Sequence, residues 1–398
     1  MTTRHLAVLG GKAAFPTTVP ITRPTLPAYK EVAPAFRRAI DSGMITKSTY
    51  LAQLEAEVGR AVGARCIGVS SCTVGLVLAL QALHIDGEVI LPSFTFLATA
   101  SAPALLRLPL RFVDIDRQTW TIDPRAVDAA INPRTAAVIA VHTFGAPADM
   151  DALEAICRKR KVALIVDAAH GLGALRKGKP VGAGGDAEVF SMSPTKLVAA
   201  GEGGLVTTTR GEVAERLEAL REYGNAGDYV TVQPGLNGRL DEMSAILALA
   251  GHRRLEANAK KRNRLVAVAK AELAGVPGIG WQRIGDGDRS SYKDLSIAVE
   301  PSEFGMDRDQ LAAVLLADRV DTRKYYSPLV HRHPAFAGSG VEPMPVSEWI
   351  ESRALSLPLF SHMPAATMRT VAQLVAAAHR DREAISGMAP ERGRTRVA

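Results

Sequence analysis

Short apolar runs alternate with helix-like segments along the first half of the chain. The runs are continuously apolar, which is typical of strands that are covered on both faces. The segments between them place their apolar residues at helical spacing. The pattern predicts strands at 66–70, 88–91, 110–114, 136–142 and 162–167, with helices at 74–83, 98–106, 124–131 and 150–159.

These repeated strand–helix units predict an α/β fold with a large doubly wound sheet that is mixed but mostly parallel. Ligands of such sheets bind beyond the carboxyl ends of the strands. The expected organisation is an N-terminal arm (1–30), a large domain (31–250), a small C-terminal α+β domain (251–387) and a disordered tail (388–398).

Helical spacing continues outside the alternating region. It predicts a broken helical stretch over 31–62, a helix at 212–223 and one long helix over 241–261, with the domain boundary near its middle. In the smaller domain we expect a strand at 295–299 and helices at 307–318 and 364–380.

Composition and charge narrow the classes of function. Hydrophobic residues make up 47% of the 398 residues and charged residues 22%, as in soluble globular proteins. No apolar run reaches the roughly 18–20 residues of a membrane span, and no secretory signal is visible, so we expect a cytoplasmic protein without a membrane partner. The three cysteines lack CxxC spacing, which argues against disulfides and a metal site. The net charge of +7 is scattered, which argues against nucleic acid and favours a small anionic substrate.

Lys196 and Asp167 are the candidate catalytic pair. Lys196 lies in a hydroxyl-rich loop, and Asp167 ends a very apolar predicted strand. Pyridoxal phosphate (PLP) enzymes need a lysine that holds the cofactor aldehyde as a Schiff base and an acid that keeps the ring nitrogen protonated. The non-catalytic alternatives are that Lys196 is a solvated loop lysine and that Asp167 caps a following helix.

Other residues near the predicted strand ends could bind the same cofactor. His170 could pack on its ring or hydrogen-bond its phenolic oxygen, although a structural histidine is an equal alternative. Ser71, Cys72 and Thr73 join a strand to a helix, where N–H groups and hydroxyls form an anion site, although simple helix capping explains Ser71 or Thr73 as well. Ser191 is a further phosphate candidate, and Phe96 could stack on the ring or belong to the core.

Taken together, these segments resemble the DegT/DnrJ/StrS sugar aminotransferases, which have the aspartate aminotransferase fold (PLP fold type I). The resemblance covers nearly the whole chain, from Leu9 to the region of Pro328. It rests on four blocks: SxxPTK…GEGG at 191–204, DAAH at 167–170, PSFTFLAT at 92–99 and HTFGAPADMDAL at 142–153.

The resemblance implies a homodimer whose active sites are shared between subunits. It implies that Asn237 and Arg239 reach the neighbouring subunit's cofactor phosphate and substrate, and that Tyr325 and Tyr326 lie near the substrate. Two features depart from the family pattern. Cys72 replaces the usual glycine at the phosphate loop, and no aromatic residue lies between Asn237 and Arg239.

We therefore expect an aminotransferase that moves an amino group from glutamate or glutamine to a keto group on a nucleotide-linked sugar. Such an enzyme would supply amino sugars for an antibiotic, another secondary metabolite or a polysaccharide. A keto-cyclitol is an alternative acceptor, and a PLP-dependent keto-sugar dehydratase is an alternative activity. Relatives that are dehydratases carry histidine in place of the lysine, so Lys196 favours transamination. A PLP-dependent regulator would need a DNA-binding domain, for which residues 31–380 leave no room.

Overall fold

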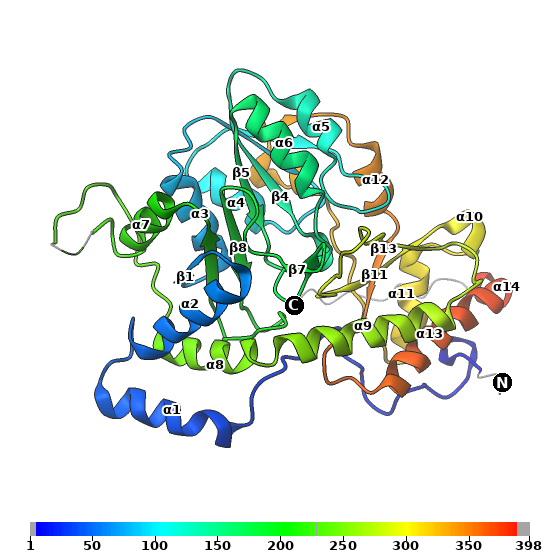
Figure 1. The fold of residues 1–398 in the computed structure, drawn as a ribbon. Coiled ribbons are helices and arrows are strands. Elements are labelled where there is room, and N and C mark those ends of the chain that lie inside the picture. Colours follow the sequence, from blue (N-terminus) through cyan, green and yellow to red (C-terminus); the bar gives the residue numbers. More distant parts are fainter. Residues whose placement is uncertain (1–4, 226, 228, 388–398) are drawn as a thin grey trace.

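An eight-stranded sheet forms the larger lobe of the computed structural model, which describes residues 5–225, 227 and 229–387 (Figure 1). Its strand order is β1-β9-β8-β5-β4-β2-β3-β12. From β8 to β12 neighbouring strands are parallel, whereas β9 is antiparallel to both β8 and β1. The strands are β1 (Arg65–Val69), β2 (Glu88–Pro92), β3 (Leu110–Val113), β4 (Thr135–Val141), β5 (Ala163–Asp167), β8 (Ala187–Ser191), β9 (Gly204–Thr208) and β12 (Gly340–Val341).

Both faces of this sheet are buried, because alternate side chains along each strand meet different helices. In β4, Val138 and Ala140 pack in a core with α2, α5, α6 and α8. Their neighbours Ala137 and Ile139 pack in a second core with α3, α4 and α7. The helices are α1 (Tyr29–Ser42), α2 (Thr49–Val62), α3 (Cys72–Ala82), α4 (Ala98–Leu105), α5 (Pro124–Ala130), α6 (Met150–Arg160), α7 (Gly211–Leu220) and α8 (Glu242–His252). The predicted doubly wound, mostly parallel α/β fold is confirmed.

A smaller lobe is built around a three-stranded antiparallel sheet, β10-β11-β13. Its core joins this sheet to α9, α11 and α13. The elements are α9 (Leu255–Glu272), β10 (Ile279–Trp281), β11 (Leu295–Val299), α10 (Pro301–Phe304), α11 (Arg308–Ala317), α12 (Pro345–Glu351), β13 (Ala354–Leu357), α13 (Ala365–Arg380) and α14 (Arg382–Ser386). The remaining elements are a hairpin, β6 (Leu175–Arg176) and β7 (Lys179–Pro180), and four 3₁₀ turns at Ala7–Leu9, Thr143–Gly145, Val330–Arg332 and Pro334–Phe336.

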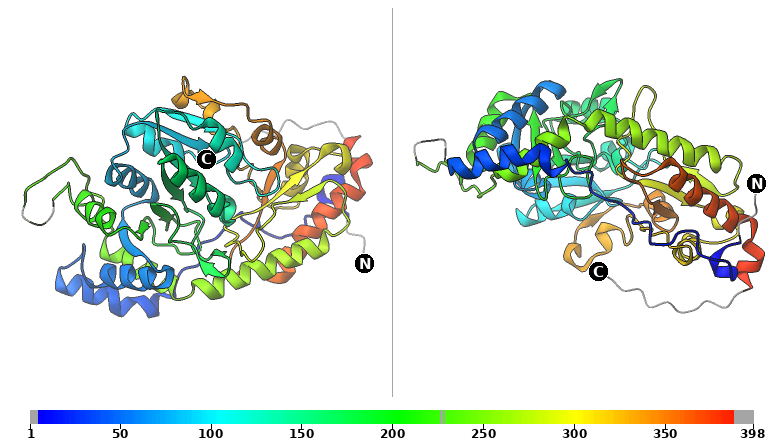
Figure 2. Two further views of the ribbon diagram at one scale, coloured as in Figure 1. Left: turned by 45° about the horizontal axis from the view of Figure 1, so that its top comes forward. Right: turned by 90° about the horizontal axis from the view of Figure 1, so that it is seen from below.

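The N-terminal arm runs along the smaller lobe rather than away from it (Figure 2). Leu6 and Val19 are buried in the core of that lobe. The carboxylate of Asp318, at the end of α11, accepts hydrogen bonds from the backbone N–H groups of Ala7 (3.1 Å) and Ala14 (2.8 Å). The predicted domain limits at 250 and 387 stay predictions, and the tail expected at 388–398 lies outside the described residues.

The long helix expected over 241–261 is wrong, because the chain forms two helices there. The break falls at Arg253 and Arg254, where Arg254 leaves helical geometry (φ −104°, ψ 0°). Arg253 pairs with Glu57 of α2 (2.6 Å), and Arg254 pairs with Glu31 of α1. No helix in the described part of the chain is long and apolar enough to cross a membrane.

Candidate active site

A cavity of about 470 Å³ lies beyond the carboxyl ends of β1, β5 and β8. It brings together most of the residues that the sequence singled out. Ten of the predicted site residues line it: Ser71, Cys72, Thr73, Phe96, Asp167, His170, Ser191, Lys196, Tyr325 and Tyr326. The tyrosines come from the segment after α11, so side chains from both lobes meet in this cavity.

Lys196 stands in the loop between β8 and β9, with its side chain largely buried in the cavity wall. A turn holds this loop, since the backbone N–H of Lys196 donates to the carbonyl oxygen of Ser193 (3.0 Å). Burial, followed by the nearby ammonium of Lys293, lowers the pKa of Lys196 to about 8. About a tenth of the amine is therefore neutral at pH 7 and about half at pH 8, and the neutral form is the one that acts as a nucleophile or proton acceptor.

Asp167 ends β5 with only 3% of its surface exposed. One carboxylate oxygen accepts a hydrogen bond from the hydroxyl of Thr99 (2.7 Å), and the other accepts from the backbone N–H of Ala169 (3.1 Å). Burial raises the pKa of Asp167, against the opposing effects of these two bonds and of Lys196. A turn rather than a helix follows the strand, so the alternative of a helix cap is not realised.

His170 is buried beside the same cavity, and its Nδ1 atom has no hydrogen-bond partner within the described residues. Burial and the two lysines, Lys196 and Lys293, lower the pKa of His170 well below its usual value. The ring is therefore neutral and retains an unused polar atom. Such an orphaned atom is the kind of group that a bound molecule satisfies.

The start of α3 forms the next part of the cavity wall. The Ser71 hydroxyl accepts the backbone N–H of Val74 (3.1 Å), so the helix-capping alternative is realised for Ser71. The Cys72 thiol lies 4.0 Å from a carboxylate oxygen of Asp167 and 3.8 Å from the carbonyl oxygen of Val189. Burial raises the pKa of this thiol well above its usual value, so Cys72 stays protonated.

Gly204, at the start of β9, allows this wall to form. A Cβ atom at Gly204 would lie 2.6 Å from the carbonyl carbon of Ser71 and 2.7 Å from the backbone nitrogen of Cys72. The last glycine of the GEGG block is thus needed for close contact between two backbones. Ser191, at the end of β8, is buried nearby and accepts a hydrogen bond from the backbone N–H of Ser193 (3.4 Å).

Aromatic side chains close the cavity. Phe96 leaves 59% of its surface exposed, so it is a cavity wall and not a core residue. Tyr326 is buried and stacks on Phe144, with ring centroids 5.5 Å apart and planes 13° apart. Tyr325 is half-buried, lines the cavity and lies beside Tyr326, with ring centroids 5.5 Å apart.

Asn237 and Arg239 do not line this cavity in their own chain. They lie at the end of the segment between α7 and α8, which projects from the molecule (Figure 1). Asn237 is exposed, and the guanidinium of Arg239 binds Glu222 (2.8 Å) and lies over the ring of Tyr223 (5.7 Å). Their predicted role therefore depends on a second subunit.

Two residues that the sequence did not single out also belong to the site. Thr99 donates a hydrogen bond to Asp167, and Lys293 lines the same cavity as Lys196. The only signal for Thr99 was its place in the PSFTFLAT block. Lys293 directly precedes Asp294 and the predicted strand at 295–299, which gave no indication of a buried lysine.

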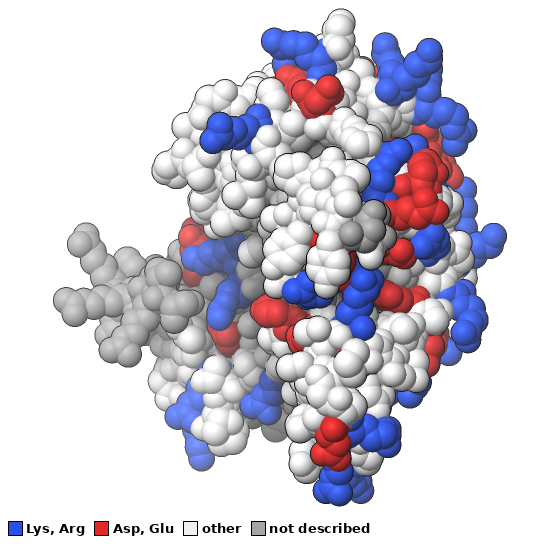
Figure 3. All heavy atoms as spheres, turned by 90° about the vertical axis from the view of Figure 1, so that its left-hand side faces the viewer, with Lys and Arg blue, Asp and Glu red and all other residues white. Residues whose placement is uncertain are grey.

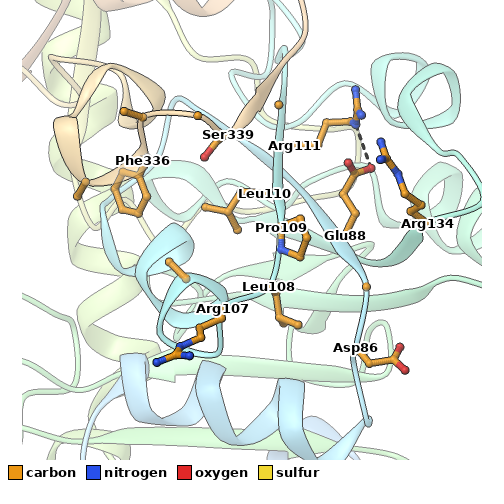
Figure 4. A pocket seen from close by; sticks show the side chains of 16 residues that line it. Asp86, Glu88, Arg107, Leu108, Pro109, Leu110, Arg111, Arg134, Phe336 and Ser339 are labelled. Atoms are coloured by element: carbon orange, nitrogen blue, oxygen red, sulfur yellow. Dashed lines mark hydrogen bonds and ion pairs between the residues drawn. The ribbon is translucent and has the colours of Figure 1, made fainter.

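A larger cavity, of about 790 Å³, lies at the amino ends of β2 and β3, away from these residues (Figure 4). Its central charged group is Arg111, which pairs with Glu88 (2.9 Å) and Glu342 (2.5 Å). These bonds attach the segment around β12 to β3, which explains the cluster structurally. The smaller cavity is therefore the candidate active site.

The groups in the smaller cavity fit PLP. They include a buried carboxylate without an ion-pair partner in the described chain, a neutral histidine with an unused nitrogen, a helix start with free N–H groups and a lysine of lowered pKa. A protonated ring nitrogen would give Asp167 the cationic partner that a buried carboxylate requires.

Comparison with known proteins agrees with this geometry. A sequence model of the DegT/DnrJ/EryC1/StrS aminotransferase family matches residues 28–376. The chain is 37% identical over 339 residues to the erythromycin biosynthesis sensory transduction protein EryC1 of Saccharopolyspora erythraea (84% of this chain, 91% of that protein). It is 33% identical over 353 residues to the UDP-N-acetyl-3-dehydro-alpha-D-glucosamine 3-aminotransferase of Acidithiobacillus ferrooxidans (88% and 94%).

Among solved structures, the chain resembles DesI in the presence of its TDP-sugar product. The TM-score is 0.90 at 32% identity, and the match covers 96% of this chain and 98% of that one. The resemblance inferred from the sequence blocks is thus confirmed, and the chain belongs to the DegT/DnrJ/EryC1/StrS family of PLP-dependent aminotransferases.

Proposed function

We propose that this aminotransferase moves an amino group from glutamate or glutamine to a keto group of a nucleotide-linked sugar, for amino-sugar or antibiotic biosynthesis. The observation that carries the chemistry is a lysine of lowered pKa, Lys196, in one cavity with a buried carboxylate, Asp167. The sugar is proposed from relatives: one is named for a UDP-linked substrate, and DesI was solved with a TDP-sugar product.

Each side chain has a proposed task around the cofactor. PLP, when bound, supplies the electron sink that stabilises a carbanion at the substrate carbon. Asp167 holds the ring nitrogen in its protonated form, and Thr99 fixes the carboxylate for that contact. The free Nδ1 of His170 is available to hydrogen-bond the cofactor. The cofactor phosphate is bound by the N–H groups and hydroxyls from Ser71 to Thr73, together with Ser191.

Lys196 would hold the cofactor aldehyde, and its amine would also carry the proton in the reaction. Once released from that attachment, its neutral amine accepts the proton from the donor's α-carbon and returns it within the cavity. The reverse sequence serves the keto acceptor, since both half-reactions need the same proton carrier. Phe96 at the cavity mouth, with Tyr325 and Tyr326, would form the surface that the sugar meets.

We further propose a homodimer in which Asn237 and Arg239 enter the partner's cavity. The segment that carries them, α1 and the residues just after α1 expose several large apolar side chains. They include Tyr29, Ile40, Met44, Ile45, Tyr223, Val232 and Leu236. Figure 3 looks onto the face from which this segment projects, where broad uncharged areas lie between the charged side chains. Exposed apolar surface of this kind is typical of a subunit interface.

The proposed place of action is the cytoplasm. All three cysteines, Cys66, Cys72 and Cys157, are free and buried, which suits a reducing compartment.

Isotope transfer tests the proposed reaction. The purified enzyme would be given glutamate or glutamine labelled with ¹⁵N at the α-amino group, together with a TDP-linked keto hexose, a UDP-linked keto hexose or a keto-cyclitol. We expect ¹⁵N in an aminated sugar nucleotide by mass spectrometry. Label in the cyclitol alone, or an unlabelled deoxysugar, would replace the proposal with the cyclitol or the dehydratase alternative.

A further inference from the structure

Lys293 brings a second ammonium group to the active-site cavity from the smaller lobe. It lies just before β11, and its side chain is 6% exposed. Among the residues that the structure describes, two lysines line this cavity, Lys196 and Lys293, and no arginine does. Nothing in the proposed reaction uses Lys293, and a buried lysine is costly to keep without a purpose.

The position of this ammonium is tightly fixed. Nζ of Lys293 donates to both carboxylate oxygens of Asp294, at 2.8 and 3.0 Å. The backbone N–H of Lys293 donates to the carbonyl oxygen of Phe144 (3.1 Å), and its own carbonyl oxygen accepts from the buried guanidinium of Arg262 (2.9 Å). The side chain also lies over the ring of Tyr325, with Nζ 5.4 Å from the centroid. These contacts hold the positive charge at one place on the cavity wall.

Several charged and titratable groups face Lys196 from different elements. They are Cys72 of α3, Asp167 of β5, His170 of the following turn, Glu202 of its own loop, Lys293 and Asp294 before β11, and Tyr325 and Tyr326 after α11. Cys72 and Tyr326 stay protonated, because burial raises the pKa of each well above its usual value. After burial itself, Lys293 is the largest influence that lowers the pKa of Lys196, whereas Asp294, Cys72 and Asp167 act in the opposite direction.

We propose that Lys293, held by Asp294, is a positioning residue that sets the charge of the Lys196 amine in the cavity that both lysines line. Two ammonium groups in one poorly solvated cavity repel each other. Asp294 holds the ammonium of Lys293 by two hydrogen bonds, whereas the amine of Lys196 has no carboxylate partner in the described part of the chain, so the repulsion acts on Lys196. The small lobe thereby contributes to the reactivity of a lysine on the large lobe.

The inference rests on the proposed attachment of the cofactor to Lys196. The alternative is a purely structural ion pair, which would stabilise the junction of the lobes and leave Lys196 unaffected. The two readings differ in the pH dependence of cofactor uptake, because only the neutral amine reacts with the aldehyde.

The test uses full-length protein freed of cofactor with hydroxylamine and then dialysed. The rate of covalent uptake of PLP is followed by absorbance between pH 6 and pH 10.5. For Lys293→Met we expect the midpoint of the rate profile to rise by about one pH unit, which slows uptake about tenfold at pH 7 and leaves it unchanged near pH 10. Lys293→Arg, which keeps a cation, should retain the wild-type midpoint.

Three controls separate charge from folding. Lys270→Met removes another lysine that lies over an aromatic ring, that of Trp281 (5.5 Å), away from the cavity, and should leave the midpoint unchanged. Lys293→Met/Asp294→Asn also removes the carboxylate and should bring the midpoint back toward wild type. Thermal unfolding of each variant checks the fold.

An unchanged midpoint in folded Lys293→Met, or equally slow uptake at every pH, would overturn the inference and leave a structural ion pair. Covalent uptake that persists in Lys196→Ala would instead overturn the proposed attachment site. The two failures are therefore distinguishable.

Discussion

Burial moves Lys196 and Asp167 toward their neutral forms. It lowers the pKa of Lys196 to about 8 and raises the pKa of Asp167. For the lysine, this is the form that reacts. For the aspartate, a nearby cation is needed to stabilise the charged carboxylate in this buried position. A protonated cofactor ring is such a cation. The two residues thus prepare the cavity for the same ligand.

Asp167→Asn tests the charge of this carboxylate. The variant keeps the size of the side chain and an oxygen for the Thr99 hydroxyl, but it cannot pair with a ring cation. We expect kcat for amino transfer to fall at least about a hundredfold, because a charge in a buried site acts strongly on the transition state. Steady-state turnover gives the result, with Asp123→Asn at the start of α5, outside the cavity, as the control. Near-normal turnover in folded Asp167→Asn would contradict the assigned role.

The sequence could identify the pair from local patterns, because Asp167 ends an apolar run and Lys196 lies in a hydroxyl-rich loop. It could not identify Thr99 or Lys293. Thr99 meets Asp167 from 68 positions away, and Lys293 reaches the cavity from the other lobe. Such contacts depend on how elements pack, which local patterns do not encode.

At the scale of elements, the predicted strands and helices of the alternating region are found, but β8 and β9 were missed. Glu188 is the second residue of β8, and a charged residue there interrupts the apolar pattern that reveals a buried strand. The expected helix over 241–261 fails for a related reason. Its pattern stays helical across Arg253, whereas the ion pairs at the break come from Glu31 and Glu57, far away in the sequence.

Glu188 in β8 makes the stability of the folded protein depend on pH. Burial raises its pKa to about 8, helped by Glu154 and opposed by the N–H of Gly184 and by Arg176. In the unfolded chain this carboxyl ionises near pH 4.5, so the folded state binds the extra proton between these two values. Stability is therefore lost as the pH rises from about 4.5 to about 8, by about 3 kcal/mol at pH 7.

Glu188→Gln should remove that loss, since an amide oxygen can still accept the Gly184 N–H (2.8 Å). We expect its thermal unfolding midpoint to exceed that of the wild type at pH 8 and to approach it at pH 5. Glu215→Gln on the exposed surface of α7 is the matched control and should show no such trend. A variant that is less stable than wild type at both pH values would refute an uncharged Glu188.

At the scale of the whole molecule, one chain supplies most of a site and leaves two predicted residues outside it. Asn237 and Arg239 lie on a segment that projects from the large lobe, next to exposed apolar side chains (Figures 1 and 3). The sequence pattern could not show this, because a single chain's hydrophobic spacing does not distinguish an interface from a core. The expectation of a shared site came from the family resemblance, which implied a homodimer.

Mixing two inactive variants tests the shared site. Lys196→Ala removes the lysine and Arg239→Ala removes the residue proposed to enter from the partner, so each homodimer should lose at least about tenfold in activity. After co-expression in equal amounts, half of the dimers would be mixed and hold one intact site each. We therefore expect recovery of about a quarter of wild-type activity, measured by amino transfer. No recovery, or full activity of Arg239→Ala alone, would argue for sites built within one chain.

Trapping the cofactor with borohydride tests the central claim most directly. The holoenzyme and its Lys196→Ala variant would be reduced with borohydride, digested and mapped by mass spectrometry, with and without earlier exposure to glutamate. The account predicts a pyridoxyl group on the peptide that contains Lys196, its loss in Lys196→Ala, and its loss in wild-type enzyme that glutamate has already converted. A label on another lysine, or one that persists in Lys196→Ala, would contradict it.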